Sequence, residues 1–254
     1  MKGAMQSVFE RLLSASCAKG SVFLVLLDPD RVSPDKVPEF AGLCARADVD
    51  GFLVGGSLTL SDSLDELIGT VKRASGLPVV LFPGNAYQIS RVADAILFLS
   101  LLTGRNADFL VGEHVKAAPL IHRWSLEVIP TAYLLVESGS LTSVQFITQS
   151  LPIPRDKIDL VVAHALAGKY LGMKLVYLEA GSGAGLPVPH QMVEAVSSVT
   201  ALPVAAGGGV RTPEEAGELA RAGARFVVVG NALEEGVEFS LLKEISSAVH
   251  FLGR

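Results

Sequence analysis

Eight short apolar runs, each bounded by turn-forming residues, constrain the fold of this chain more than any other feature of its sequence. The runs are Ser21–Leu27, Gly51–Val54, Pro78–Phe82, Ala95–Leu99, Glu127–Val136, Lys174–Glu179, Pro203–Ala206 and Arg225–Val229. Apolar runs of this length are typical of strands buried on both faces of a parallel sheet. None approaches the roughly 20 apolar residues that a membrane-spanning helix needs. The sequence therefore predicts eight buried strands and no transmembrane segment.

Most segments between the runs carry signals for the start of a helix. Ser33 and the proline after it predict an N-cap with proline at the first helical position, and Ser61 opens a segment with acidic residues. Thr212 is followed by a proline and then by Glu215, three residues after the cap, which is the pattern of a capping box. Helices are therefore expected between successive strands.

Alternation of strands and helices favours parallel strands joined by right-handed crossovers. Eight such units close into a barrel, whereas an open doubly wound sheet more often stops at five or six. No linker rich in Pro, Ser and Gly divides the chain. We therefore expect an α/β fold, a single (β/α)8 TIM-barrel domain over residues 1–254.

One crossover is too short for the regular pattern. Only twelve residues separate Phe82 from Ala95, and they include Pro83, Gly84 and Asn85. We expect the third helix of the barrel to be short or absent.

Composition excludes several classes of function. The net charge is -5 and no run of five or more basic residues occurs, so the chain has no feature expected of a nucleic-acid-binding protein. The N-terminus lacks the pattern of a secretory signal. Cys17 and Cys44 are isolated thiols, which fits a reducing compartment. Together these features predict a cytoplasmic protein.

Three glycine-rich turns follow the last three predicted strands. They are Gly181-Ser182-Gly183, Gly207-Gly208-Gly209 and Gly230-Asn231. In TIM barrels the active site lies at the carboxyl ends of the strands, where the late loops often hold a phosphate. Glycine lets the backbone approach an anion closely, and N–H groups at a helix start point toward the charge. The alternative is that these glycines only make tight turns, but three at matching strand ends favour a phosphate site.

A second constellation lies at the ends of the first two strands, where Asp28 and Ser57 occur. A carboxylate and a hydroxyl at adjacent strand ends suit Mg²⁺, which takes oxygen ligands, waters and substrate phosphates. The alternative is structural: an Asx-type turn at Asp28 and a helix N-cap at Ser57. Spacing alone leaves both interpretations open.

Glu179 is the acidic residue that the pattern singles out as catalytic. Alternation along its strand places it on the face opposite Leu178 and Ala180, looking into the barrel mouth. There it can accept hydrogen bonds or a proton from a substrate hydroxyl. In that case its replacement by glutamine should lower turnover with little change in thermal stability. A structural salt bridge is the alternative.

At these motifs the sequence closely resembles the geranylgeranylglyceryl phosphate synthase family, which includes the heptaprenylglyceryl phosphate synthases. The matching stretches are LDPDR at Leu27–Arg31, VGGS at Val54–Ser57, FPGN at Phe82–Asn85, IPTAY at Ile129–Tyr133, YLEAGSGA at Tyr177–Ala184, GGGVR at Gly207–Arg211 and VGN at Val229–Asn231. The resemblance implies a barrel that lacks its third helix, in agreement with the short crossover.

The resemblance also implies a reaction. The enzyme would join sn-glycerol 1-phosphate to a polyprenyl diphosphate, geranylgeranyl diphosphate being the expected one. It would form an ether and release diphosphate, as a Mg²⁺-dependent prenyltransferase of membrane ether-lipid biosynthesis. Asp28 and Ser57 match the family's Mg²⁺ positions. The residues that match its glycerol-phosphate positions are Tyr177, Leu178, Glu179, Ala180, Gly181, Ser182, Gly183, Gly208, Gly209, Gly230 and Asn231.

The assembly is implied in the same way. The stretches at Ser100–Asn106 and Phe109–Gly112 look like the family's second subgroup, many of whose members form dimers or hexamers. The chain departs from the family at Thr103-Gly104, where Asn-Ser is frequent. A homo-oligomer is therefore expected, together with peripheral membrane contact for release of the lipid product.

Two other classes remain as alternatives. An isomerase or aldolase acting on a sugar phosphate would need an acid–base pair or a Schiff-base lysine at the strand ends, and no lysine stands out there. A non-catalytic barrel that binds phosphates or lipids would show a degraded metal site, yet Asp28 and Glu179 are both present.

Overall fold

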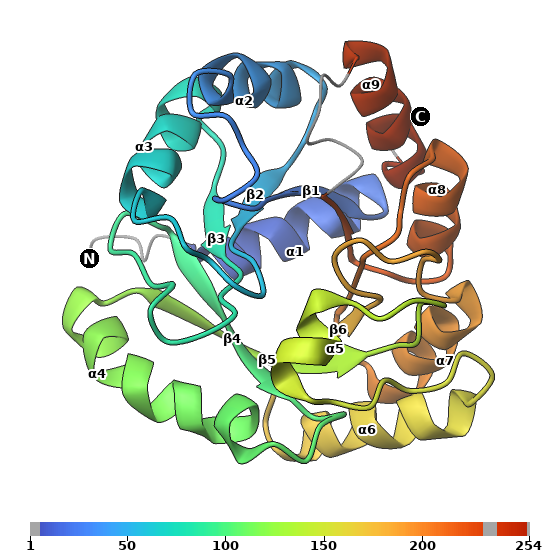
Figure 1. Ribbon diagram of the computed structural model, residues 1–254. Helices are drawn as coiled ribbons and strands as arrows, with labels where there is room; N and C mark the ends of the chain where they lie inside the picture. The colour runs from blue at the N-terminus through green and yellow to red at the C-terminus, as the bar shows by residue number, and fades with distance from the viewer. Residues whose placement is uncertain (1–5, 231–237, 253–254) are drawn as a thin grey trace, which may run out of the picture.

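The computed structural model describes residues 6–230 and 238–252, which form a closed barrel of eight parallel strands in sequence order (Figure 1). The strands are β1 Val22–Leu27, β2 Gly51–Val54, β3 Val79–Leu81, β4 Ala95–Leu101, β5 Glu127–Leu135, β6 Leu175–Glu179, β7 Val204–Gly207 and β8 Phe226–Val229. Each predicted run forms one strand, and no end differs from the prediction by more than two residues. The barrel closes because β1 pairs with both β2 and β8. The predicted fold class is confirmed.

Most helices surround the strands on the outside of the barrel, whereas α1 and α5 lie over its two ends (Figure 1). The helices are α1 Val8–Lys19, α2 Val37–Arg46, α3 Leu64–Ser75, the π-helix η1 Asp108–Gly112, α4 Glu113–Trp124, α5 Ser143–Thr148, α6 Ile158–Tyr170, α7 His190–Thr200, α8 Pro213–Arg221 and α9 Phe239–Val249. Residues 82–94, between β3 and β4, contain no helix, as the short crossover predicted. Within the described residues, no helix is long and apolar enough to cross a membrane.

The helix-start signals succeed in one case and fail in two. Thr212 and Glu215 form the predicted capping box at α8. The prediction at Ser33 is wrong because Ser33 first closes a turn: its carbonyl accepts the N–H of Lys36 at 3.0 Å, and α2 begins one residue later. The helix predicted to open at Ser61 begins only at Leu64, after a turn in which the Ser61 and Ser63 hydroxyls lie 2.6 Å apart.

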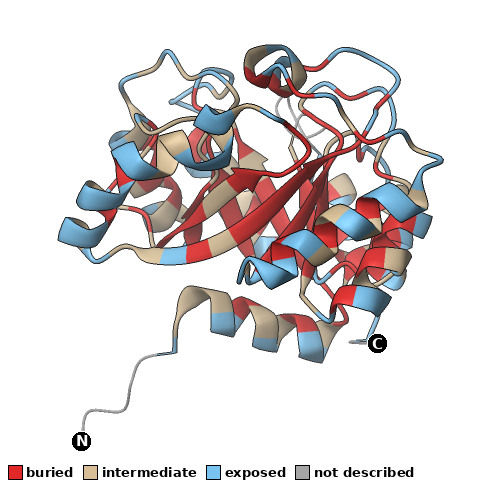
Figure 2. Ribbon diagram, turned by 90° about the horizontal axis from the view of Figure 1, so that it is seen from below, coloured by how far each residue is buried: buried red, intermediate tan, exposed pale blue. Residues whose placement is uncertain are grey.

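The core consists of two layers that follow from the alternation of strand side chains. Along β1, Val22 and Leu24 point into the barrel, whereas Phe23 and Val25 pack against the surrounding helices. Because both faces are covered, the strands are buried almost throughout (Figure 2). This double burial explains why the runs are continuous rather than alternating in polarity.

Helix α1 crosses the amino-terminal end of the barrel and closes it (Figures 1 and 2). The N–H groups of Val8 and Phe9 donate to the Glu127 carboxylate at 2.7 and 2.9 Å, which satisfies two groups at the helix start. The Phe9 ring stacks on Phe226, with ring centres 6.1 Å apart. Helix α1 therefore covers the barrel interior at this end.

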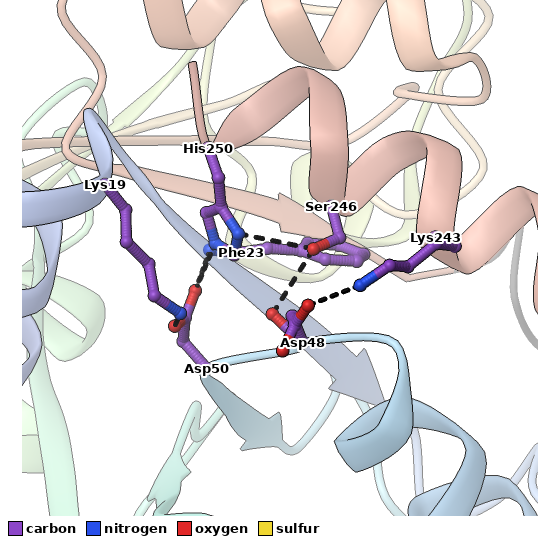
Figure 3. A network of polar contacts seen from close by, with 7 residues as sticks. All are labelled: Lys19, Phe23, Asp48, Asp50, Lys243, Ser246 and His250. Atoms are coloured by element: carbon purple, nitrogen blue, oxygen red, sulfur yellow. Dashed lines mark hydrogen bonds and ion pairs between the residues drawn. The ribbon is translucent and has the colours of Figure 1, made fainter. Parts of the chain in front are cut away.

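A polar network ties the chain ends together at the closed end of the barrel (Figure 3). The Asp50 carboxylate receives hydrogen bonds from His250 Nε2 at 2.7 Å and from the Phe23 N–H at 2.8 Å, and it forms an ion pair with Lys19. Burial alone would raise the pKa of Asp50, but these partners outweigh it and hold the pKa below its usual value. The Asp50 carboxylate therefore has a structural role.

Candidate active site

One cavity at the carboxyl ends of the strands collects both predicted constellations. It has a volume of about 320 Å³ and receives loops that follow strands on opposite sides of the barrel. The predicted site residues that line it are Asp28, Ser57, Glu179, Ser182, Gly183, Gly208, Gly209 and Gly230. The early acidic loops and the late glycine turns therefore face a common space, as the barrel topology requires.

Glu179 lies at the end of β6 with its side chain toward this cavity, as predicted from alternation. Leu178 packs among the outer helices and Tyr177 inside the barrel. The Glu179 residue is only 4% exposed, and its Oε1 accepts the N–H of Gly181 at 2.6 Å. No cation pairs with it among the residues that the structure describes. The salt-bridge alternative is therefore not supported.

The environment of Glu179 favours its neutral form. Burial raises the pKa of the carboxyl to about 7, although the Gly181 N–H and the Tyr177 hydroxyl partly stabilise the charge. The Tyr177 hydroxyl lies near this carboxyl, but the geometry falls short of a hydrogen bond, and the hydroxyl has no partner among the described residues. A carboxyl that titrates near neutrality beside an unpaired buried hydroxyl is suited to exchange a proton with a bound ligand.

The glycine turn after β7 brings its backbone against the turn after β6. Gly208 and Gly209 have φ values of +82° and +71°, which side-chain-bearing residues rarely adopt. A Cβ at Gly208 would overlap Glu179 Oε1 and would lie 2.6 Å from the backbone nitrogen of Gly181. Glycine is therefore required here for close approach, and the backbone stays open to the cavity.

The start of α8 contributes less to anion binding than the sequence predicted. The Glu215 carboxylate accepts the N–H groups of Arg211 and Thr212 at 2.7 and 3.1 Å, and Thr212 accepts that of Glu215. The capping box thus occupies these donors. The backbone of Gly208 and Gly209, which lines the cavity, is better placed for an anion.

Asp28 and Ser57 occupy the other side of the cavity. Asp28 Oδ1 accepts the N–H of Asp30 at 3.0 Å, which forms the Asx-type turn of the structural alternative, and Oδ2 lies 3.5 Å from Arg31 Nε. Burial raises the pKa of Asp28, against the lowering effect of the Asp30 N–H and the Arg31 guanidinium. Ser57 is not a helix N-cap, because α3 begins at Leu64.

The donor set at this side fits Mg²⁺ rather than a transition metal. Within the described residues, no cluster of three or more His, Cys, Asp or Glu side chains could hold a metal. A carboxylate and a hydroxyl on one cavity wall leave most coordination positions to water and phosphate, as Mg²⁺ prefers. The residues present therefore fit this ion.

Several predicted site residues do not present a side chain to the cavity. Leu178 and Ala180 are buried against the outer helices, so only their backbone could approach a ligand. Gly181 acts through its N–H on Glu179. Gly230 lines the cavity without a left-handed backbone, and Asn231 lies outside the described residues.

A second, apolar cavity beside the first was not predicted. Its volume is about 90 Å³, and its walls include Ile96, Phe98 and Phe109 from β4 and the segment after it. It shares Gly56, Ser57, Phe82, Tyr133, Val144 and Ile147 with the polar cavity. The missing third helix was the signal that could have located it, because residues 82–94 leave that side without a helix.

Arg31 and Arg211 also line the polar cavity. Both stand within stretches that the sequence singled out, LDPDR and GGGVR, but neither was assigned a role.

Comparison with known proteins agrees with this geometry. The model of the PcrB family matches residues 16–249. The chain belongs to the PcrB family. Geranylgeranylglyceryl phosphate synthase of Chitinophaga pinensis is 46% identical over 92% of this chain and 92% of its own length. The enzyme of the same name from Thermococcus gammatolerans is 43% identical, over 94% and 96%.

Among solved structures, this PcrB family member is similar to those of geranylgeranylglyceryl phosphate synthases. The crystal structure of (S)-3-O-geranylgeranylglyceryl phosphate synthase from Thermoplasma acidophilum, in complex with its substrate sn-glycerol-1-phosphate, superposes with a TM-score of 0.91 at 36% identity. The alignment covers 97% of this chain and 100% of that chain. The tryptophan synthase of Mycobacterium tuberculosis, with a TM-score of 0.60 at 16% identity, shares the fold alone.

Proposed function

We propose that this chain is a prenyltransferase that joins sn-glycerol 1-phosphate to a polyprenyl diphosphate, geranylgeranyl diphosphate being the expected donor. The observation that carries the proposal is the contact between two unlike cavities. One is polar and holds glycine turns with Glu179, and the other is apolar and opens beside Ser57. The names of the relatives and the glycerol phosphate bound to the Thermoplasma acidophilum protein support the same assignment.

The glycerol phosphate binds on the side of the late glycine turns. The backbone of Gly208 and Gly209 holds the phosphate beside Gly183, since positive φ and the lack of Cβ at Gly208 and Gly209 let an anion approach the backbone closely. The free hydroxyl then points to Glu179, which orients it and accepts its proton. The remaining matched residues, Tyr177, Leu178, Ala180, Gly181, Ser182 and Gly230, complete this side through packing or backbone contacts.

The prenyl diphosphate binds on the opposite side. Asp28 and Ser57 would hold Mg²⁺, which when bound neutralises the charge of the leaving diphosphate. The allylic carbon–oxygen bond breaks, the glycerol oxygen bonds to the allylic carbon, and diphosphate leaves. The apolar walls around Ile96, Phe98 and Phe109 hold the chain and keep water from the allylic centre.

We further propose that the protein works in the cytoplasm, as a homo-oligomer of the second subgroup, with peripheral membrane contact for release of its ether lipid. Several large apolar side chains on the segments that follow the strands are exposed and support such contact: Leu58, Leu60, Tyr87, Leu141, Leu151 and, on α5, Phe146. Both cysteines are unpaired, in agreement with a reducing compartment.

The decisive experiment incubates purified protein with sn-glycerol 1-phosphate, Mg²⁺ and a series of prenyl diphosphates of increasing length. The expected product is an acid-stable prenyl ether formed with release of one diphosphate. The sn-glycerol 3-phosphate enantiomer is the control for substrate choice. The absence of ether with every donor would reject the proposed function. Full activity in excess chelator would reject only the metal.

A further inference from the structure

The segment that replaces the third helix contains a buried polar side chain, Gln88, that is 4% exposed. Its Oε1 accepts the N–H groups of Gly84 at 3.1 Å and Gly56 at 3.3 Å. Its Nε2 donates to the carbonyl of Gly56 at 2.9 Å. One side-chain amide therefore binds both backbone polar groups of Gly56, and it ties the turn after β2 to the turn after β3.

Gly56 is the point at which this contact reaches the site. A Cβ at Gly56 would lie 3.0 Å from Asp28 Oδ2, so the Asp28 carboxylate rests against this residue. The carbonyl that Gln88 binds belongs to the peptide bond that joins Gly56 to Ser57. Gln88 thus restrains the Gly56–Ser57 peptide, which leads into Ser57 from the residue that the Asp28 carboxylate rests against; Asp28 and Ser57 are the two residues assigned to Mg²⁺.

The neighbouring backbone leaves little room for adjustment. A Cβ at Gly84 would overlap the carbonyl oxygen of Gly56 and would lie 2.7 Å from that of Ser57. Gly56 and Ser57 line both the polar and the apolar cavity. A small rotation of this turn would therefore move the wall that the two cavities share, where the diphosphate would join the prenyl chain.

We propose that Gln88 is a positioning residue for the diphosphate side of the site. It fixes the Gly56–Ser57 peptide so that Asp28 and Ser57 can hold the metal and its diphosphate, and it has no part in binding glycerol phosphate. This inference rests on the proposed function. In a regular barrel a crossover helix would cover this turn. Here a single buried amide orders it through three hydrogen bonds.

The test compares Gln88→Met, which keeps the side-chain length without the amide, with Ser90→Ala as matched control. Ser90 is buried in the same segment, and its hydroxyl accepts only the N–H of Val92 among the described residues, at 3.0 Å. Gln88→Met should raise the KM for prenyl diphosphate about tenfold and weaken calorimetric binding of inorganic diphosphate with Mg²⁺ to a similar extent. Binding of sn-glycerol 1-phosphate should change less than about twofold. Ser90→Ala should leave all three constants unchanged.

The proposal would be overturned if Gln88→Met weakened the binding of both substrates equally. It would also be overturned if the melting temperature fell while all three constants stayed unchanged. Gln88→Glu keeps the acceptors for Gly56 and Gly84 but places a carboxylate oxygen against the Gly56 carbonyl, and should weaken diphosphate binding at least as much as Gln88→Met while sn-glycerol 1-phosphate binding is retained. If Gln88→Met does not fold, Gln88→Glu is tested in the same way, by comparing its effect on diphosphate binding with its effect on sn-glycerol 1-phosphate binding. Wild-type protein that forms no ether would instead reject the proposed function, whereas active wild type beside an unaffected Gln88 variant rejects this inference alone.

Discussion

The two ends of the barrel use the same residue types in opposite ways. At the closed end, Asp50 is buried but engaged by His250, Lys19 and a backbone N–H, and its pKa is lowered (Figure 3). At the open end, Glu179 is buried more completely and has one backbone donor of good geometry, and its pKa rises to about 7. A buried carboxylate with a full set of partners stabilises the fold, whereas one that lacks partners is left to bind or react.

Asp28, also at the open end, lies between these two cases: it has structural partners, yet its pKa is raised. Its turn with Asp30 and its contact with Arg31 resemble structural roles, yet burial still raises its pKa. Its partners therefore do not fully compensate for the loss of water. The comparison between the two ends can be tested by replacing one carboxylate at a time.

The largest effect is expected for Asp28→Asn. Loss of the charge should lower turnover by on the order of 10³-fold, because removal of one group that stabilises leaving-group charge typically has effects of this size. Affinity for sn-glycerol 1-phosphate, measured by calorimetry, should stay nearly unchanged because that ligand binds on the far side. Normal turnover with normal Mg²⁺ dependence would remove Asp28 from the metal site.

Glu179→Gln should follow, with a turnover loss on the order of 10²-fold, the lower range of general-base catalysis. In the wild type, activity should rise as the pH increases through about 7, where the carboxyl ionises. The variant should lack this rise. A pH–rate profile of both proteins checks the prediction, and an unchanged profile in the variant would contradict it.

The same substitution has a stability effect that the sequence did not predict. The pKa of Glu179 is raised in the folded protein, so its contribution is present below about pH 4.5 and lost as the pH rises through about 7. This loss amounts to about 3 kcal/mol in total. Glu179→Gln should therefore melt above the wild type at pH 8, not unchanged as expected from the sequence. Equal melting temperatures at pH 5 and pH 8 for both proteins would contradict the raised pKa.

Asp50→Asn, at the closed end, should lower stability and leave activity unchanged. Turnover per folded molecule should stay normal, while unfolding free energy falls by about 2 kcal/mol because the partners of a buried carboxylate lose their charge-assisted bonds. Since the pKa of Asp50 is lowered, its contribution is present above about pH 4 and lost as the pH falls further. Denaturant titrations at pH 7 and pH 3 should differ less in the variant than in the wild type.

The smallest effect is expected for Gly208→Ala, whose Cβ would meet the Glu179 carboxylate. The KM for sn-glycerol 1-phosphate should rise about tenfold and turnover should fall by a similar factor, with little change in the KM for prenyl diphosphate. Gly76→Ala is the matched control: Gly76 also has positive φ, +70°, but a Cβ there would meet no atom within 4 Å. Equal kinetic effects of both substitutions would show that backbone strain alone is responsible.

The sequence by itself determined the elements whose signals are local. Eight apolar runs gave eight strands, the short crossover after Phe82 gave the missing helix, and alternation gave the direction of Glu179. These features follow from chain periodicity and from the residues that turns require, so a single sequence carries them. It also placed Asp28 and Ser57 at adjacent strand ends, because parallel strands bring their carboxyl ends together.

Only the tertiary structure decided how completely each polar group is satisfied. Lys19, Asp50 and His250 are distant in sequence and meet because α1 and α9 converge at the closed end of the barrel. Gln88 reaches Gly56 across two turns, and the pKa of Glu179 depends on burial by its neighbours. Hydrogen bonding and desolvation depend on three-dimensional proximity, which residue spacing does not record. For that reason the same carboxyl group becomes a structural anchor at one end of the barrel and a candidate base at the other.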